Sequence, residues 1–138
     1  MREVIFRGKS VETGNWIYGF YCPYLTNSYI LAYEAQFSDH RYLFDYAVWI
    51  DTETVGQYTG LRDKNGVEIY EGDICLHKDY ECAGKIEYST SECAYAFMVI
   101  YGSNNGVKYE FEWLYEYADG LRVIGNIFDN PEMLEEDQ

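Results

Sequence analysis

Positive charge is scarce in this chain. Its 138 residues include 10 lysines and arginines against 24 aspartates and glutamates, which gives a formal net charge of −14 at pH 7. No cluster of cations is denser than Arg2, Arg7 and Lys9. Direct DNA or RNA binding needs a basic patch, and anionic membrane surfaces attract cations rather than carboxylates. We therefore expect neither direct nucleic-acid binding nor membrane binding.

Long apolar runs are also missing. The run Tyr95–Tyr101 is far shorter than the roughly 20 residues that a helix needs to span a bilayer. The segment Met1–Lys9 has neither the apolar core nor the cleavage site of a signal peptide. We therefore expect a cytoplasmic protein with reduced thiols. The four cysteines are Cys22, Cys75, Cys82 and Cys93.

Catalytic motifs are equally scarce. The sequence has no phosphate-binding loop, no Gly-x-Gly-x-x-Gly after a strand and no Gly-x-Ser-x-Gly turn. The two histidines, His40 and His77, are few for acid–base chemistry. Carboxylates such as Glu110 and Glu112 are interpreted as solvated groups on a strand face. We predict a protein that is not an enzyme, with no catalytic residue and no cofactor.

One cysteine–histidine pair needs separate attention. Cys75 and His77 are two residues apart on a predicted strand, so their side chains point the same way. With Cys82 and Cys93 they could form a Cys₃His zinc site, but the spacing is not that of a standard finger or ribbon. At about 6–7 Å on one strand face, Cys75 and His77 are too far apart for a nucleophile–base hydrogen bond. We interpret Cys75 as a buried residue and His77 as an edge residue, and predict no metal ligand.

What the chain does have is tyrosine. It holds 16 tyrosines, 19% aromatic residues and 48% hydrophobic residues, which is too apolar for intrinsic disorder. Tyrosine favours strands and packs well on a pleated surface. Two interpretations follow: a sheet that uses tyrosine in its core, or an exposed aromatic surface for a partner.

Short β-prone segments separated by turn residues run along the chain. They are Val4–Phe6, Trp16–Cys22, Tyr29–Tyr33, Ala47–Ile50, Gln57–Leu61, Val67–Tyr70, Ile74–His77, Lys85–Tyr88, Tyr95–Tyr101, Val107–Tyr115 and Val123–Ile124. Apolar and charged residues alternate in Val107–Tyr115, which predicts a half-buried antiparallel strand. Closely spaced strands of this kind predict a mainly β fold, a small antiparallel barrel or sandwich with an SH3-like barrel portion around residues 54–100.

Turn and cap signals complete the expected fold. Asn65-Gly66 predicts a tight hairpin turn in which both residues adopt positive φ. Ser103–Gly106 predicts a second hairpin turn. Asn130 is a candidate N-cap and Pro131 suits a first helical position, so we expect a short C-terminal helix.

Three blocks of the sequence resemble a known family. They are Arg7–Lys9 with Trp16–Gly19, Asp51–Gly66 continuing into Glu68–Ile74, and Val123–Phe128 with Asn130-Pro131-Glu132. In order and content these blocks resemble the YopX-like family of phage and prophage proteins. The resemblance implies a mostly β fold and a setting in the cytoplasm of an infected or lysogenic bacterium. It supplies no activity and no catalytic residues.

The blocks also have a physical interpretation as a fold-defining motif. Its glycines are expected where the chain turns or backbones approach closely, and Asp73 is expected to bond backbone amides at a turn. The motif residues are Thr59, Gly60, Asp63, Asn65, Gly66, Tyr70, Gly72, Asp73, Gly125 and Asn126. The alternative is a binding surface on the barrel.

For the organisation of the chain we expect a single domain over residues 1–138, or an N-terminal β lobe (1–50) packed on an SH3-like barrel (51–138). The leading function is a non-enzymatic protein-interaction module that binds a host or phage protein, or itself as a homo-oligomer. A second hypothesis is an acidic mimic of nucleic acid acting on a host DNA-binding protein, because residues 68–138 hold sixteen acids and four cations. A third is a small ligand-binding or enzymatic β-domain with an aromatic pocket.

Overall fold

The fold of the chain consists of two compact units, Met1–Tyr58 and Thr59–Gln138. It is given by a computed structural model that describes residues 4–32, 47–80, 82–103 and 106–134. His40, Arg2 and the centre of the turn expected at Ser103–Gly106 lie outside the described residues. None of the helices among the described residues is long and apolar enough to cross a membrane.

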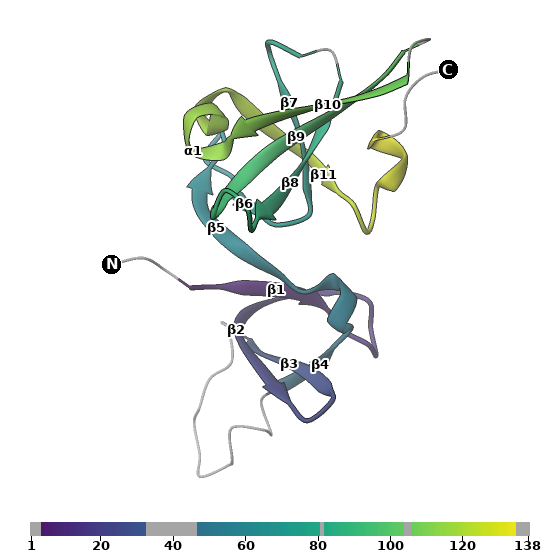
Figure 1. Cartoon of the computed structure of the whole chain (residues 1–138). Helices are drawn as coiled ribbons and strands as arrows, with labels where there is room; N and C mark the ends of the chain where they lie inside the picture. The colour runs from purple at the N-terminus through teal and green to yellow at the C-terminus, as the bar shows by residue number, and fades with distance from the viewer. Residues whose placement is uncertain (1–3, 33–46, 81, 104–105, 135–138) are drawn as a thin grey trace. The chain divides into compact units, whose positions relative to one another are not determined.

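The first unit is built around an antiparallel sheet (Figure 1). Its hydrogen-bonded order is β4-β3-β2-β1-β5. The elements are β1 (Phe6–Lys9), β2 (Trp16–Tyr24), β3 (Asn27–Ala32), β4 (Ala47–Ile50), the 3₁₀ turn η2 (Thr52–Thr54) and the beginning of β5 (Gly56–Arg62). Ile30 and Ile50 are almost wholly buried on one face of this sheet. A Cβ atom on Gly8 would collide with Ile50, so glycine lets β1 approach this core closely.

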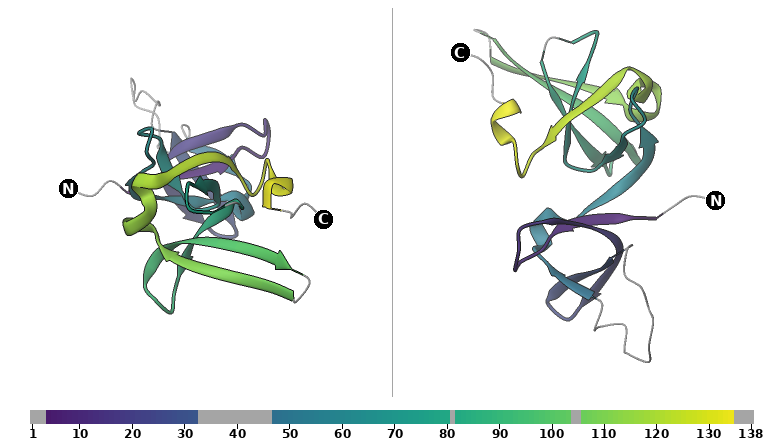
Figure 2. Two further views of the ribbon diagram at one scale, coloured as in Figure 1. Left: turned by 90° about the horizontal axis from the view of Figure 1, so that it is seen from above. Right: turned by 180° about the vertical axis from the view of Figure 1, so that it is seen from behind.

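The second unit contains the end of β5, its neighbour β6 and a five-stranded antiparallel sheet of order β10-β9-β8-β7-β11. Its elements are β6 (Glu68–Tyr70), β7 (Asp73–His77), β8 (Gly84–Ser89), β9 (Ala94–Ser103), β10 (Gly106–Trp113), α1 (Leu114–Tyr117), the 3₁₀ turn η3 (Ala118–Gly120), β11 (Leu121–Asn126) and the 3₁₀ turn η4 (Pro131–Leu134). The long hairpin of β9 and β10 is visible in Figures 1 and 2.

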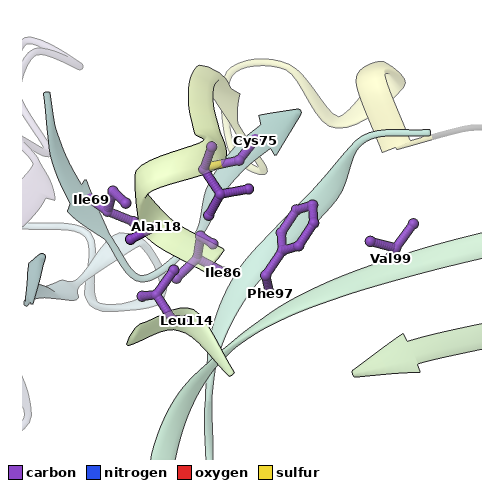
Figure 3. Packing of buried hydrophobic residues seen from close by; sticks show 8 residues of the cluster. Ile69, Cys75, Ile86, Phe97, Val99, Leu114 and Ala118 are labelled. Carbon is purple, nitrogen blue, oxygen red and sulfur yellow. The ribbon is translucent and has the colours of Figure 1, made fainter. Parts of the chain in front are cut away.

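The core of the second unit is a cluster of eight buried residues (Figure 3). They come from five strands and from the helical connection between β10 and β11: Ile69, Cys75, Ile86, Phe97, Val99, Leu114, Ala118 and Leu121. Phe97 is the largest of the fully buried side chains. The hydrophobic effect of this cluster is therefore the main force that holds strands β6 to β9, β11 and the helical connection together.

The predicted mainly β architecture with antiparallel sheets and a short helix near the C-terminus is confirmed. The described strands do not form a closed barrel, because β10 and β11 are opposite edges of their sheet. The strands of residues 54–100 are divided between two open sheets, which fits the sandwich-like alternative.

Several predicted boundaries differ from the structure. The strand expected at Val4–Phe6 is Phe6–Lys9, since Gly8 continues the strand instead of ending it. The strand expected at Val107–Tyr115 ends at Trp113, because Leu114 turns inward as the first, fully buried residue of α1. The expected C-terminal helix is a single 3₁₀ turn beginning at Pro131.

Replacing Phe97 with alanine tests the role of the core cluster. Phe97→Ala is expected to lower the free energy of unfolding by about 3–5 kcal/mol, because it removes buried surface and leaves a cavity. Tyr115→Ala, at a ring that is 65% exposed, is expected to change it by less than about 0.5 kcal/mol. Urea denaturation followed by circular dichroism measures both; equal losses would contradict the assignment of Phe97 to the core.

Candidate functional site

The carboxylate of Asp63 organises the turn between β5 and β6. Its Oδ1 accepts hydrogen bonds from the backbone N–H groups of Asn65 (2.8 Å) and Val67 (2.9 Å). Its Oδ2 accepts one from Val123 N–H in β11, at 3.0 Å. One side chain thus joins a local turn to a strand sixty residues further along the chain.

This turn is not the predicted one. Gly66 has a φ of 83°, but Asn65 does not have positive φ, so the expectation of two such residues is wrong. Gly66 N–H donates to Asp63 O, and Asp63 N–H donates to Val67 O, which is the pattern of a three-residue loop with glycine at its last position. The Asp63 carboxylate satisfies two donors of this loop, so Asn65 need not adopt positive φ.

The other motif residues between β5 and β7 bind backbone groups or allow the backbone to turn. Thr59 Oγ1 donates to Ile69 O at 2.7 Å, and Asp73 Oδ2 accepts from Tyr70 N–H at 2.7 Å, as expected for Asp73. Gly60 and Gly72 have φ values of 86° and 88°. A Cβ atom on Gly72 would also crowd the ring of Phe128.

The two motif residues of β11, Gly125 and Asn126, support the turn that follows this strand. Asn126 Oδ1 accepts hydrogen bonds from Phe128 N–H and Asp129 N–H, which forms a side-chain-supported turn. Asn130, the predicted N-cap, instead accepts a hydrogen bond from Asn126 N–H through Oδ1. A Cβ atom on Gly125 would collide with this amide, so glycine is needed at that position.

The Cys75–His77 pair lies on one side of β7, as the sequence predicts, and both residues are buried. Cys75 packs within the core cluster, where no substrate reaches its thiol. His77 Nδ1 accepts a hydrogen bond from Asp79 N–H at 3.1 Å, and its ring packs on Tyr117. His77 is therefore a buried residue of an inner strand and not the edge residue that the sequence predicts. Within the described residues, no three Cys, His, Asp or Glu side chains are placed to hold a metal ion, and all four cysteines are free.

A carboxylate that the sequence assigned to solvent belongs to a small polar cluster. Glu112 is half-buried, and Tyr80 donates a 2.7 Å hydrogen bond to its Oε1. The pKa of the Tyr117 hydroxyl is raised, first because it is hydrogen-bonded to Glu112 and then by desolvation. The alternation in β10 placed Glu112 correctly along the strand but could not show that two tyrosines from other elements cover it.

The first unit carries a different kind of surface, which we call the aromatic face. Residues directly opposite in antiparallel strands share one face of the sheet, and the register places one set opposite the buried Ile30 and Ile50. The aromatic face consists of Arg7, Lys9, Trp16, Tyr18, Phe20, Cys22, Tyr24, Asn27, Tyr29, Leu31, Ala47 and Trp49. None of these strand positions is acidic.

Four rings of the aromatic face are strongly exposed. The exposed fractions are 43% for Tyr18, 52% for Phe20, 53% for Tyr24 and 45% for Trp49. Single exposed apolar residues are normal on a protein surface, but a contiguous group on one sheet face is typical of an interaction site.

The two cations of the aromatic face are held against one ring. The guanidinium carbon of Arg7 lies 4.6 Å from the centroid of Trp16, and Lys9 Nζ lies 5.5 Å from it. Both distances fit cation–π contacts. Because Arg7 is only 6% exposed, the surface that a partner meets is mainly aromatic rather than basic.

Residues 5–135 match the family model described as YopX protein. The chain belongs to the YopX family. It is also similar to protein EF1440 from Enterococcus faecalis, a crystal structure with 23% sequence identity and a TM-score of 0.46, over 98% of this chain and 100% of that chain. None of the curated proteins matches this YopX-family chain. The match to the family model confirms the predicted family resemblance.

The Asp63 carboxyl of this YopX-family chain makes its stability depend on pH. Burial alone would raise the pKa of this group, but hydrogen bonds from Val123, Val67 and Asn65 and the charge of Lys64 outweigh it, so the pKa lies below its ordinary value of 3.8. The folded state therefore binds the proton less readily than the unfolded state. The resulting stabilisation is present above pH 3.8 and is lost as pH falls through the lowered value.

Asp63→Asn is expected to lower the free energy of unfolding at pH 7 by about 2–3 kcal/mol, because an amide presents one acceptor oxygen to three N–H donors. The difference from the wild type should shrink below about pH 4, as the wild-type carboxyl becomes protonated. Asp119→Asn, which removes the same charge from an exposed position, is the control. Urea denaturation over a pH series measures both, and a loss for Asp63→Asn that stays constant down to pH 2 would contradict the proposed role of ionised Asp63.

Proposed function

We propose that this YopX-family chain is a non-enzymatic protein-interaction module, and that the aromatic face of its first unit is the binding surface. The observation that carries the proposal is the exposure of Tyr18, Phe20, Tyr24 and Trp49 on one sheet face without an acidic residue among its positions. Aromatic rings provide large contact areas with little loss of side-chain entropy, and they are enriched at the centres of interfaces.

The charge of the chain indicates the kind of partner. A net charge of −14 attracts positively charged proteins at long range and repels polyanions. We therefore infer a partner with a basic overall charge and an apolar patch. It is a protein of the host cell or of a phage, and it meets this chain in the bacterial cytoplasm.

The non-enzymatic character is supported by what the reactive side chains do. The thiol of Cys75 is in the core, the Nδ1 atom of His77 accepts a backbone N–H, and Glu112 accepts a hydrogen bond from Tyr80. Each of these atoms thus has a structural contact within the fold. A nucleophile or general base must instead face the substrate.

Two other roles are less well supported. A mimic of nucleic acid needs carboxylates spread along a continuous face, and the lysines and arginine that gather beside β7 and β11 interrupt the acidic surface of the second unit. Stacked rings can also bind single-stranded nucleic acid, but that mode depends on a positively charged groove, whereas Arg7 is buried against Trp16.

Alanine variants of the aromatic face test the proposal. The wild-type chain is used to capture its partner from the bacterial host, and the purified partner is titrated against each variant by isothermal titration calorimetry. Phe20→Ala and Tyr24→Ala are each expected to weaken binding about tenfold or more, as truncation of central aromatic residues does. Higher salt is expected to weaken binding further, because a basic partner loses its attraction to the acidic chain.

Tyr115→Ala is the matched control, since it removes an exposed ring of the second unit; it should leave the affinity unchanged within about twofold. The proposal is wrong if Phe20→Ala and Tyr24→Ala capture and bind the partner like the wild type. It is also wrong if the aromatic face binds a single-stranded oligonucleotide more tightly than any protein captured.

A further inference from the structure

The second unit has an open depression of about 300 Å³ on its surface, which we call the cationic depression. It is lined by Lys64, Leu76, His77, Lys78, Tyr80 and Arg122. All six residues belong to the second unit. Three of them carry a permanent positive charge, and none is acidic.

Backbone hydrogen bonds bring the three cations together from distant positions in the sequence. Arg122 lies directly opposite Leu76 in the β7–β11 pair, so their side chains share a face. Lys78 is two residues beyond Leu76 and directly follows β7. The N–H of Lys64 donates to Leu121 O at 3.0 Å, which holds the β5–β6 turn beside β11. The convergence of the cations is therefore a consequence of backbone pairing.

The charge of the depression is opposite to that of its surroundings. The second unit, residues 59–138, has seventeen acids and six cations. Half of these cations line one depression, without a single acid among the lining residues. The fold therefore concentrates positive charge at one place on an acidic unit.

The three cations are not neutralised within the fold. Among the residues that the structure describes, Lys64, Lys78 and Arg122 form no ion pair, whereas Lys85 pairs with Glu87 at 3.3 Å. Two carboxylates lie close by: Asp63, whose pKa is lowered in part by the charge of Lys64, and Asp79, whose Oδ2 lies 3.7 Å from Nδ1 of the lining residue His77. Neither of them lines the depression, so the three cations face a ligand directly.

We propose that the cationic depression binds a small molecule that carries a phosphate group and an apolar or aromatic part. Arginine presents paired N–H donors that match phosphate oxygens, and lysines add point charges. Leu76 and the ring of Tyr80 supply a partly apolar wall beside the cations. The volume is at the lower end of the range for small-molecule sites, which fits a phosphate joined to one ring system.

The negative charge of the surrounding surface limits the size of the ligand. A nucleic acid would extend beyond the depression and place further phosphates over an acidic surface, where each is repelled. A molecule with one phosphate keeps its charge beside the three cations. The small ligand is therefore favoured over a polyanion.

Calorimetric titration of the full chain tests this assignment with four probes: adenosine 5′-monophosphate, inorganic phosphate, adenosine and a single-stranded oligothymidylate. We expect adenosine 5′-monophosphate to bind more tightly than inorganic phosphate, and adenosine to show no binding. Arg122→Gln and Lys64→Gln are each expected to weaken the binding of adenosine 5′-monophosphate about tenfold or more, the loss of one charge-assisted hydrogen bond.

Lys85→Gln is the matched control, because it removes the same formal charge from an ion-paired lysine outside the depression. It should change the affinity less than about twofold. Thermal unfolding of all variants checks that they are folded, as expected for the exposed Arg122 and Lys64 and the half-buried Lys85.

Three results would overturn the proposal. Equal effects of Lys85→Gln and Arg122→Gln would show a general charge effect instead of a site. Equal affinity for inorganic phosphate and adenosine 5′-monophosphate would remove the organic part of the ligand. Tighter binding of the oligothymidylate than of adenosine 5′-monophosphate would replace the small molecule with a single-stranded nucleic acid.

Discussion

The hydrogen bonds of the Asp63 carboxylate connect the local and the long-range order of the second unit. Two of the three shape the turn between β5 and β6, and the third reaches Val123 in β11. The adjacent Lys64 N–H reinforces this link by donating to Leu121 O. A charged group that accepts several backbone N–H bonds loses little by leaving water, so a buried carboxylate is stable here. The position of Lys64 at the cationic depression depends on this arrangement.

The strands could be predicted from the sequence because their signals are local. Alternation of apolar and charged residues identified β10, and the turn residues around Asp63 and Gly72 located the neighbouring strands. The errors arose where a residue outside the local window decides the conformation. Asn65 does not need positive φ because the Asp63 carboxylate accepts two N–H groups of the loop, which the Asn-Gly pair alone does not indicate. Trp113 ends β10 because Leu114 is taken into the core, which no period-two pattern shows.

The two candidate surfaces were visible in the sequence to different degrees. The excess of tyrosine indicated an aromatic surface as one of two interpretations, and the register of β1–β4 then showed which rings share a face. The cationic depression gave no sequence signal. Lys64, Lys78 and Arg122 are widely separated along the chain and each has acidic residues nearby in sequence. A search for runs of lysine and arginine therefore could not find them, because the pairing of β7 with β11 and the hydrogen bonds between the β5–β6 turn and β11 bring them together.

An acidic chain can hold both a surface for basic proteins and a site for an anion because the two effects act over different distances. Long-range attraction depends on the summed charge of the chain and governs the encounter with a large partner. At physiological ionic strength this field decays over about 8 Å. Inside the cationic depression the nearest charges dominate, and those are Lys64, Lys78 and Arg122. A small anion responds to these three groups, whereas a large partner responds to the −14 charge of the whole chain. If both proposals hold, the acid excess selects partners by size as well as by sign.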